Sequence, residues 1–342
     1  MDAEMRTEGM PSLTVAIPTL GRPCLMDALR SLAEVDGFTD LEVLVCGNVT
    51  SESVRIELTE FLKDHPNVIN PPDSLALRSL HSKRNLGWQL ARTELVAYLD
   101  DDVVLEREWA RKIVEPFSDS GVGIVSGPGL IPDQLGLMAR LAGLALSSGA
   151  TGYVAERYKQ NVTPVRPIKW SNIIGCNMAI RRCLLEEVGG FNPFFEAGDE
   201  MFISHAICKR GHRIVFASEA RAYHYPRATL RGFIRQIYGY GDTRVRLIRN
   251  GVEVEAATLI PALLVLSVVV LTVTSLVLPQ AGLLLGVELA VYMLGVAIVV
   301  GGIVVKTRRA CDLLLLLLVP LMHAVYGFAE WKELFFPRRK PV

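Results

Sequence analysis

The sequence predicts an α/β domain with a mostly parallel, Rossmann-like sheet and helices on both faces, followed by an all-α transmembrane region. Apolar runs alternate with helical patterns over the first 225 residues, which is typical of repeated β-α-β units. Long uncharged segments follow near the end of the chain, and 50% of the 342 residues are hydrophobic. We therefore expect a domain over residues 1–225, a basic interfacial helix region over 226–255 and a transmembrane region of two to three helices over 256–342.

The predicted strands are short apolar runs between helical patterns. They are Leu13–Ile17, Leu41–Cys46, Leu75–Leu80, Leu95–Leu99 and Val122–Ser126, and the helical patterns cover residues 23–35, 53–62, 82–91 and 107–117. Buried strands separated by helices favour right-handed crossovers and a parallel sheet. Ligands bind such sheets beyond the carboxyl ends of the strands, where the stretches "PTLGRP", "HSKRN" and "DDD" fall.

The acidic triplet Asp100, Asp101 and Asp102 directly follows one of these strands. Adjacent carboxylates repel one another and raise one another's pKa unless solvent or a cation neutralises them. The triplet alone leaves two interpretations open: a metal site, or a solvated turn before the next helix.

Three apolar segments predict the membrane region. Thr258–Leu278 carries no charge, Gly282–Val305 carries only Glu288, and Leu313–Ala329 carries only His323. A bilayer requires roughly 20 apolar residues per helix, so the first two segments are expected to span it. The third is shorter, and the basic tail "PRRKPV" would lie outside the cell after three crossings. The third segment is therefore left open as spanning, re-entrant or interfacial.

The charge distribution indicates which side of the membrane the domain occupies. Seven arginines and one acid lie between Arg221 and Asn250, directly before the first span. This pattern fits a helix on an anionic cytoplasmic leaflet and predicts that the N-terminal 250 residues lie in the cytosol. The net charge of zero argues against a nucleic-acid partner, and six cysteines without a C-x-x-C pair argue against structural zinc.

Three stretches in order carry a family resemblance: "VAIPTLGRP", then "SKRNLGWQLARTELVAYLDDDV", then "GCNMAIRRCLLEEVGGFNPFFEAGDEMFISHAICKRGHRIVFASEARAYHYPR". Over about residues 12 to 250 the chain resembles the inverting, family 2 glycosyltransferases with the GT-A fold. The resemblance implies a nucleotide-sugar donor, Mg²⁺ or Mn²⁺ as cofactor, and, from the apolar tail, a lipid-linked or polysaccharide acceptor. It also implies a multi-pass protein of a prokaryotic cell membrane.

The resemblance implies a role for each motif. The D-x-D pair supplies metal ligands, with Asp102 the direct ligand and Asp100 also near the ribose; His224 matches a position that meets the metal or diphosphate in some relatives. The implied donor-binding residues are Pro18, Thr19, Arg84, Asn85, Asp100 and Asp101. Carboxylates suit a hard divalent cation that neutralises the leaving diphosphate.

A second acidic group, Asp199 and Glu200 in "EAGDEMF", falls at the acceptor side of the family pattern. Glu200 takes the place of the catalytic base, which would remove the proton of an acceptor hydroxyl. The alternative is an exposed first turn of a helix, where acids favour the dipole. Further residues assigned to the acceptor side are Asn177, Arg231, Gln236 and Arg244.

The sequence departs from the family in three places. Gly47 stands where relatives often carry an acid that reads the base, so uracil and guanine both stay open. Phe202 replaces a further acid, and "RQIYGYGDTR" lacks the Q-x-x-R-W signature of processive synthases. We therefore expect single additions.

The expected function is a membrane-anchored, inverting transfer of a sugar to a polyprenyl-linked or other lipid-linked acceptor. A dolichol-phosphate-sugar-synthase-like enzyme, with a polyprenyl phosphate acceptor, is the alternative within this class. A metal-dependent nucleotidyltransferase is disfavoured because "PTLGRP" is a poor phosphate loop. A non-catalytic membrane scaffold stays open because of Gly47 and Phe202.

Overall fold

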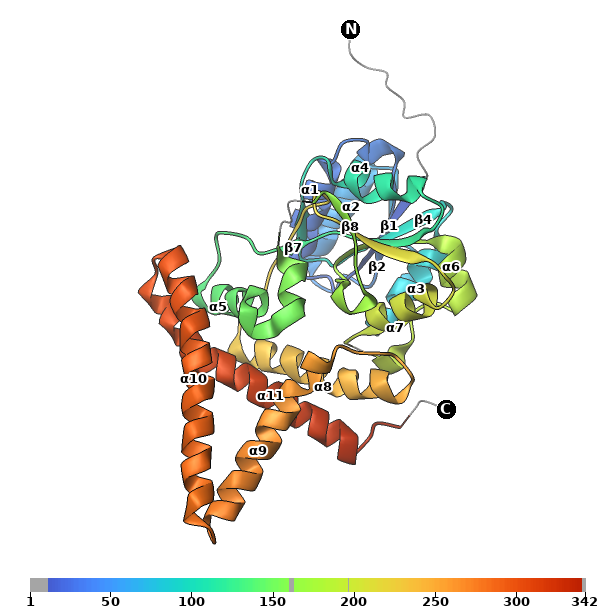
Figure 1. Ribbon diagram of the computed structural model, residues 1–342. Helices are drawn as coiled ribbons and strands as arrows, with labels where there is room; N and C mark the ends of the chain where they lie inside the picture. The colour runs from blue at the N-terminus through green and yellow to red at the C-terminus, as the bar shows by residue number, and fades with distance from the viewer. Residues whose placement is uncertain (1–11, 160–162, 196, 340–342) are drawn as a thin grey trace. The chain divides into compact units, whose positions relative to one another are not determined.

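The computed structural model describes residues 12–159, 163–195 and 197–339, which form two compact units. The first unit comprises the chain up to Pro132, Arg157–Pro193 and Asp199–Tyr225. The second comprises Asp133–Glu156, Phe194–Gly198 and the chain from Pro226. Figure 1 labels the α-helices and several of the strands of both units.

An eight-stranded sheet with the order β3-β2-β1-β4-β9-β6-β10-β8 forms the centre of the first unit. Its strands are β1 (Leu13–Pro18), β2 (Glu42–Cys46), β3 (Val68–Ile69), β4 (Leu95–Leu99), β6 (Val122–Ser126), β8 (Val165–Pro167), β9 (Asn177–Arg181) and β10 (Arg213–Ala217). Pairing is parallel from β3 to β4 and between β6 and β10, whereas β9 and β8 run antiparallel to their neighbours. The predicted α/β class with a mostly parallel sheet is confirmed.

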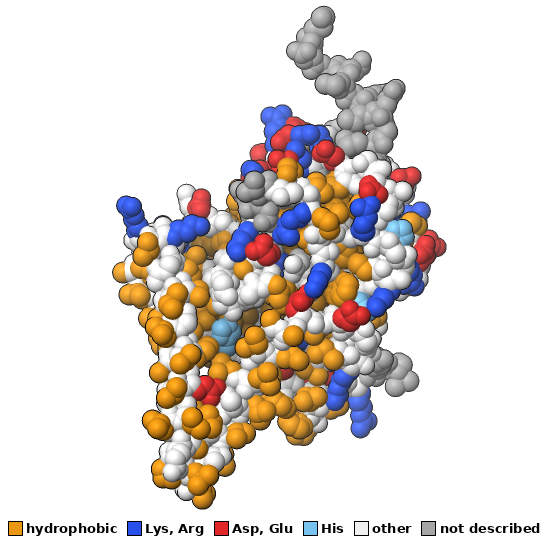
Figure 2. Space-filling model, in the orientation of Figure 1, with side chains coloured by type: hydrophobic (Ala, Val, Ile, Leu, Met, Phe, Trp, Pro, Cys, Tyr) orange, Lys and Arg blue, Asp and Glu red, His pale blue; other side chains and the backbone are white. Residues whose placement is uncertain are grey.

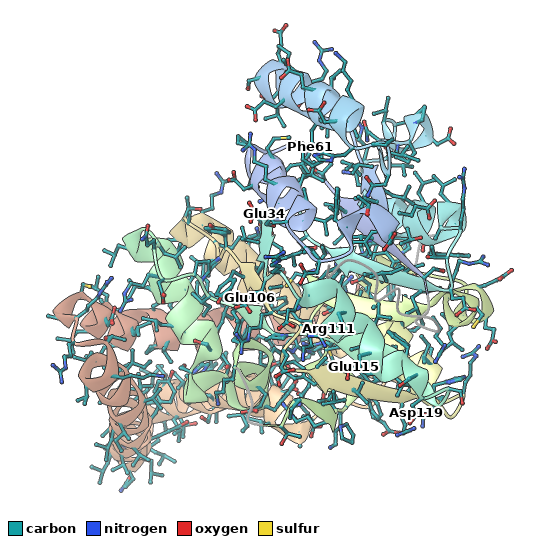
Figure 3. All side chains as sticks on the ribbon, turned by 90° about the horizontal axis from the view of Figure 1, so that it is seen from above. Glu34, Phe61, Glu106, Arg111, Glu115 and Asp119 are labelled. Carbon is teal, nitrogen blue, oxygen red and sulfur yellow. The ribbon has the colours of Figure 1, made fainter. Side chains whose placement is uncertain are left out.

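The predicted helices are also present, with small shifts at their ends. The first unit contains α1 (Cys24–Ala33), α2 (Glu52–Asp64), α3 (Leu80–Leu90), α4 (Trp109–Val114), α6 (Arg182–Val188) and α7 (Asp199–Cys208). Helix α4 buries Trp109 and Ile113, while Arg111, Glu115 and Asp119, labelled in Figure 3, are exposed along α4 and the turn after it. This one-sided burial is what the helical spacing predicted.

The predicted strand Leu75–Leu80 is wrong. Leu75 and Leu80 are exposed, and Ser79 caps α3 by accepting a hydrogen bond from the backbone N–H of Ser82 at 3.0 Å. Serine at an N-cap favours the start of a helix over the continuation of a strand. The strand in this part of the chain is β3, which pairs with β2 and was not predicted.

A second, three-stranded sheet places the acidic triplet. It has the order β5-β11-β7 and comprises β5 (Val103–Leu105), β7 (Gly129–Leu130) and β11 (Ala222–His224). Strand β5 follows the triplet at once, and Val103 pairs with His224 in the antiparallel register. This register brings His224 beside the carboxylates that end β4.

The second unit is helical. It contains α5 (Leu137–Ser147), α8 (Leu230–Arg249), α9 (Ile260–Ser275), α10 (Pro279–Thr307) and α11 (Leu315–Phe335). Three segments are long and apolar enough to cross a membrane: Ala256–Ser275, Pro279–Thr307 and Ala310–Phe335. Figure 2 shows hydrophobic side chains over the outside of α9 and α10, as expected for a membrane-associated region.

Candidate active site

Asp100, Asp102 and His224 form a cluster at the end of β4. Their ligand atoms all lie within 4.8 Å of one another. His224 Nε2 is 3.2 Å from Asp102 Oδ1 and 3.9 Å from Asp100 Oδ2. Burial raises the pKa of Asp100, Arg84 opposes the shift, and the charge of Asp102 adds to it. Two carboxylates and an imidazole fit a divalent cation such as Mg²⁺ or Mn²⁺, so the donor set suits the expected cofactor.

The middle carboxylate of the triplet has another role. Asp101 Oδ2 accepts hydrogen bonds from Thr19 Oγ1 at 2.7 Å and from the backbone N–H of Leu20 at 3.1 Å. Arg22 Nη2 pairs with Asp101 and also donates to Asp102 Oδ2 at 3.0 Å. Because these protein donors contact both of its oxygens, Asp101 fixes the loop after β1; its expected role in binding the donor stays a prediction.

The same loop explains Gly47. Its backbone has a φ of 153°, and an added Cβ would lie 2.2 Å from the carbonyl oxygen of Thr19. Lys83 Nζ donates to that carbonyl oxygen at 2.6 Å, and the Thr19 N–H donates to the Cys46 carbonyl at 2.9 Å. No side chain, and hence no base-reading acid, fits at position 47 in this structure.

Arg84 connects the two acidic groups. Its Nη1 donates to both carboxylate oxygens of Asp199 at 3.0 Å, and its Nη2 lies 3.5 Å from Asp100 Oδ1. Nη2 also donates to the Gly175 carbonyl at 3.1 Å, and the guanidinium lies over the Phe191 ring, 5.4 Å from its centroid. Arg84 is only 3% exposed. These contacts occupy the side chain that was expected to grip phosphate, so a positioning role fits Arg84 better.

Two predicted asparagines also have structural contacts. Asn85 donates to the Phe191 carbonyl at 2.9 Å and accepts from the Phe191 N–H at 2.7 Å, so its amide fixes the chain before α7. Asn177 donates to the carbonyls of Pro128 and Ala220 and accepts from the indole of Trp109 at 2.9 Å. These protein partners favour a structural role for both amides, and the expected roles of Asn85 at the donor and Asn177 at the acceptor stay predictions.

Asp199 and Glu200 begin α7. Asp199 is 2% exposed and, in addition to Arg84, has His81 Nε2 at 3.4 Å. Glu200 is partly buried, and burial together with the charge of Asp199 raises its pKa to about 7. A carboxylate that titrates near neutral pH accepts a proton more readily than an ordinary glutamate, as general-base catalysis requires.

The remaining predicted acceptor residues belong to α8, in the second unit. Arg231 is exposed, Gln236 donates to the Tyr240 hydroxyl at 2.9 Å, and Arg244 is 3% exposed. Their acceptor role stays a prediction.

Two residues that contact the acidic groups were not predicted. They are Arg22, which pairs with Asp101 and Asp102, and His81, which lies beside Asp199. Both occur inside quoted motifs, in "PTLGRP" and "HSKRN". The sequence offers one signal, a basic residue inside each motif, and this signal does not identify the acidic partner.

The comparison with protein families decides the class. The sequence model of glycosyl transferase family 21 matches residues 2–332. The chain belongs to glycosyl transferase family 21. It is thus a glycosyltransferase of the GT-A type with a C-terminal apolar helical region, as the resemblance implied, whereas the family 2 label is not confirmed.

Curated relatives of this family 21 glycosyltransferase are 23–30% identical to it over the aligned residues. The pre-mycofactocin glycosyltransferase of Mycobacterium tuberculosis is 25% identical over 69% of this chain and 47% of its own length. The glucosyl-dolichyl phosphate glucuronosyltransferase of Haloferax volcanii is 23% identical over 43% of this chain and 48% of its own length. A GalNAc(5)-diNAcBac-PP-undecaprenol beta-1,3-glucosyltransferase of Campylobacter jejuni is 30% identical over 27% of this chain and 30% of its own. The chain spans less than half the length of these relatives.

Solved structures share the fold of the family 21 enzyme. The mannosyltransferase PcManGT from Pyrobaculum calidifontis, in complex with GDP-Man and Mn²⁺, has a TM-score of 0.58 at 18% identity and covers 96% of this chain and 88% of its own. A fragment of S. aureus TarS in complex with UDP-GlcNAc has a TM-score of 0.50 at 14% identity, covering 72% of this chain and 68% of its own. At these identities the likeness establishes the GT-A fold alone.

Proposed function

We propose that this family 21 glycosyltransferase transfers a sugar from a nucleoside diphosphate sugar to a hydroxyl group of a lipid-linked acceptor, with inversion at the anomeric carbon. One observation carries the proposal: in one compact unit, Arg84 joins the Asp100–Asp102–His224 cluster to the pair Asp199 and Glu200. The first group suits a cation and the leaving diphosphate, and the second suits the attacking hydroxyl.

Asp102, Asp100 and His224 are proposed to hold Mg²⁺ or Mn²⁺. A bound divalent cation would neutralise the charge that develops on the leaving nucleoside diphosphate. Arg22 forms ion pairs with both Asp101 and Asp102. Asp101 also accepts a hydrogen bond from Thr19, so it holds Thr19 and Arg22 in place beside the cluster. Pro18 and Thr19 are proposed to face the nucleotide, on a loop held in shape by Asp101.

Glu200 is proposed as the catalytic base. Its carboxylate takes the proton of the acceptor hydroxyl while the hydroxyl oxygen bonds to the anomeric carbon and the bond to the diphosphate breaks. Attack from the face opposite the diphosphate yields a β-linked product from an α-linked donor. Asp199 keeps the pKa of Glu200 high and is itself held by Arg84, so Asp199 and Arg84 are positioning residues.

The raised pKa of Glu200 also favours one acceptor chemistry. A polyprenyl phosphate is already an anion and does not need a base, whereas a sugar hydroxyl on a lipid carrier does. The names of the relatives from Haloferax and Campylobacter describe acceptors of the second kind, sugars already attached to a polyprenyl carrier. The apolar helices and the arginine-rich α8 support an integral membrane enzyme with α8 on an anionic leaflet, over the residues 226–255 expected to be interfacial.

The test uses the full chain in lipid nanodiscs with Mn²⁺. A panel of nucleotide sugars is screened for thermal stabilisation, and the donor that stabilises the protein is assayed for transfer to lipid-linked sugars. Asp102→Asn should abolish metal-dependent donor binding in calorimetry. Glu200→Gln should keep donor binding but lower turnover about 10²- to 10⁴-fold. Glu115→Gln, an exposed carboxyl on the first unit, is the matched control and should behave as wild type.

Unchanged turnover in Glu200→Gln would show that Glu200 is not the catalytic base. Normal donor affinity in Asp102→Asn would remove Asp102 from the metal site. Transfer to polyprenyl phosphate alone would replace the hydroxyl acceptor by the phosphate acceptor.

A further inference from the structure

Helices α9 and α10 form an antiparallel hairpin in the second unit. They are joined by Leu276–Leu278, and Ser267 on α9 donates a hydrogen bond to Glu288 on α10. In each of the segments Ala256–Ser275 and Pro279–Thr307, only 11% of the 18 most apolar consecutive residues is buried. Helices that are apolar all round cross bilayers, so the start of α9 and the end of α10 face the same side of the membrane.

Helix α11 begins at the end of α10 but returns to the start of α9. In the turn that joins the two helices, Thr307 Oγ1 at the end of α10 donates to Asp312, three residues before α11, at 2.5 Å. Further along, Trp331 Nε1 donates to the Ala262 carbonyl at 2.8 Å. An added Cβ on Gly327 would lie 2.3 Å from the Pro261 carbonyl oxygen, which shows how closely the two helices approach. Both ends of α11 therefore meet the same side of the hairpin.

A spanning helix would make different contacts. The 21 residues of α11 extend about 31 Å, enough to cross a bilayer. If α11 crossed, its last two turns would lie at the level of Leu276–Leu278. They contact the first turn of α9 instead, at the opposite end of the hairpin.

Helix α8 binds the same end of α11. An added Cβ on Gly241 would lie 2.4 Å from the Tyr326 carbonyl oxygen, and Arg249 donates to the Leu334 carbonyl at 2.9 Å. Beyond α11, Arg338 lies 3.3 Å from Asp242 on α8. Since α8 precedes the first span in the chain, these contacts tie the end of α11 to the side of the membrane on which α8 lies (Figure 1).

The exposed face of α11 is narrow and apolar. Leu317, Phe328 and Phe335 are 59–73% exposed and recur at spacings of 11 and 7 residues, which places them on one side of the helix. The opposite side is buried and includes Glu330 and Glu333. In α11, 33% of the most apolar window is buried, three times the share in α9 or α10. A helix with one lipid-facing stripe fits the interfacial layer of a bilayer.

We propose that α11 does not cross the membrane but lies in the leaflet next to α8, so that the C-terminus emerges on the same side as α8. The lipid headgroup and upper acyl region of that leaflet is the partner of its exposed face. This inference uses contacts of the second unit alone and does not depend on the proposed sugar transfer. With two crossings instead of three, the basic tail "PRRKPV" lies on the same side as the arginine-rich α8, as the distribution of positive charge predicts. Residues 340–342 of this tail lie outside the described residues.

The test determines the sidedness of three single cysteines in the full chain. The background replaces Cys24, Cys183, Cys208 and Cys311 by serine, which leaves only the buried native thiols of Cys46 and Cys176. Ala257→Cys marks the side of α8, Val277→Cys marks the hairpin turn, and Pro337→Cys follows α11. Sealed vesicles of known orientation are treated with a membrane-impermeant maleimide before and after permeabilisation.

Pro337→Cys should react from the same side as Ala257→Cys and from the opposite side to Val277→Cys. Reaction of Pro337→Cys together with Val277→Cys would show that α11 crosses and would overturn the proposal. A protease-cleavable epitope after Val342, on the otherwise unchanged chain, gives a second measurement that needs no cysteine. Its digestion from the side of Val277→Cys would overturn the proposal equally.

Discussion

The raised pKa of Glu200 makes a quantitative prediction about the pH dependence of transfer. As the proposed base, Glu200 must be ionised to take the proton of the acceptor hydroxyl, and burial raises its pKa from the ordinary 4.5 to about 7. With a pKa of 7, about one-tenth of the molecules carry an ionised Glu200 at pH 6 and about one-hundredth at pH 5. With the ordinary value, Glu200 would be almost fully ionised at pH 6. We therefore expect kcat/KM to rise about tenfold per pH unit below 7 and to level off above it.

Substitutions of two neighbours of Glu200 should shift the pH profile in opposite directions. A general loss of stability would not produce opposite shifts. Asp199 raises the pKa of Glu200 and Arg84 lowers it. Asp199→Asn should move the acid limb of the profile to lower pH, and Arg84→Gln should move it to higher pH. The assay is kcat/KM for transfer at saturating metal between pH 5 and 8.5, with circular dichroism at each pH to confirm folding.

Stability provides an independent readout of the same group. A carboxyl whose folded pKa is raised binds more protons in the folded state, so wild-type stability falls as pH rises from about 4.5 to about 7. Glu200→Gln removes this loss and should be more resistant to heat than wild type at pH 8, with the difference vanishing near pH 4. A flat activity profile between pH 5 and 7, or an equal loss of stability with pH in Glu200→Gln, would refute the reasoning.

Three further variants test the contacts around the site. Gly47→Ala should lower the free energy of unfolding by about 1–3 kcal/mol, because the added Cβ collides with the Thr19 carbonyl. The control Gly136→Ala should leave it unchanged, because no atom lies within 4 Å of the added Cβ. Equal denaturant midpoints for the two variants would contradict this prediction. Asn85→Ala should lower stability by about 2 kcal/mol while the folded fraction binds donor normally in calorimetry; a selective loss of donor affinity would restore Asn85 to the donor site. Asp101→Asn should reduce thermal stability but keep metal affinity, measured by Mn²⁺ titration; lost metal affinity would make Asp101 a ligand.

Sequence reasoning found the residue types of the site better than their roles. The acidic groups are recognisable because closely spaced carboxylates at a strand end are costly without a compensating charge. The role of Arg84 was not recognisable, because its partner Asp199 is 115 residues away along the chain. The contacts of Asn85 and Asn177 were not recognisable for the same reason: whether an amide meets a backbone carbonyl depends on which segments the fold brings beside it.

The sequence by itself determined the alternation of strands and helices, the apolar C-terminal region and the identity of the acidic residues, because these follow from local periodicity, hydropathy and charge. Tertiary structure decided that His224 meets Asp100 and Asp102, through the pairing of β11 with β5. It also decided that Thr19 excludes any side chain at position 47 and that α11 returns to the start of α9. Each of these depends on contacts between segments far apart in the chain, which only the folded backbone defines.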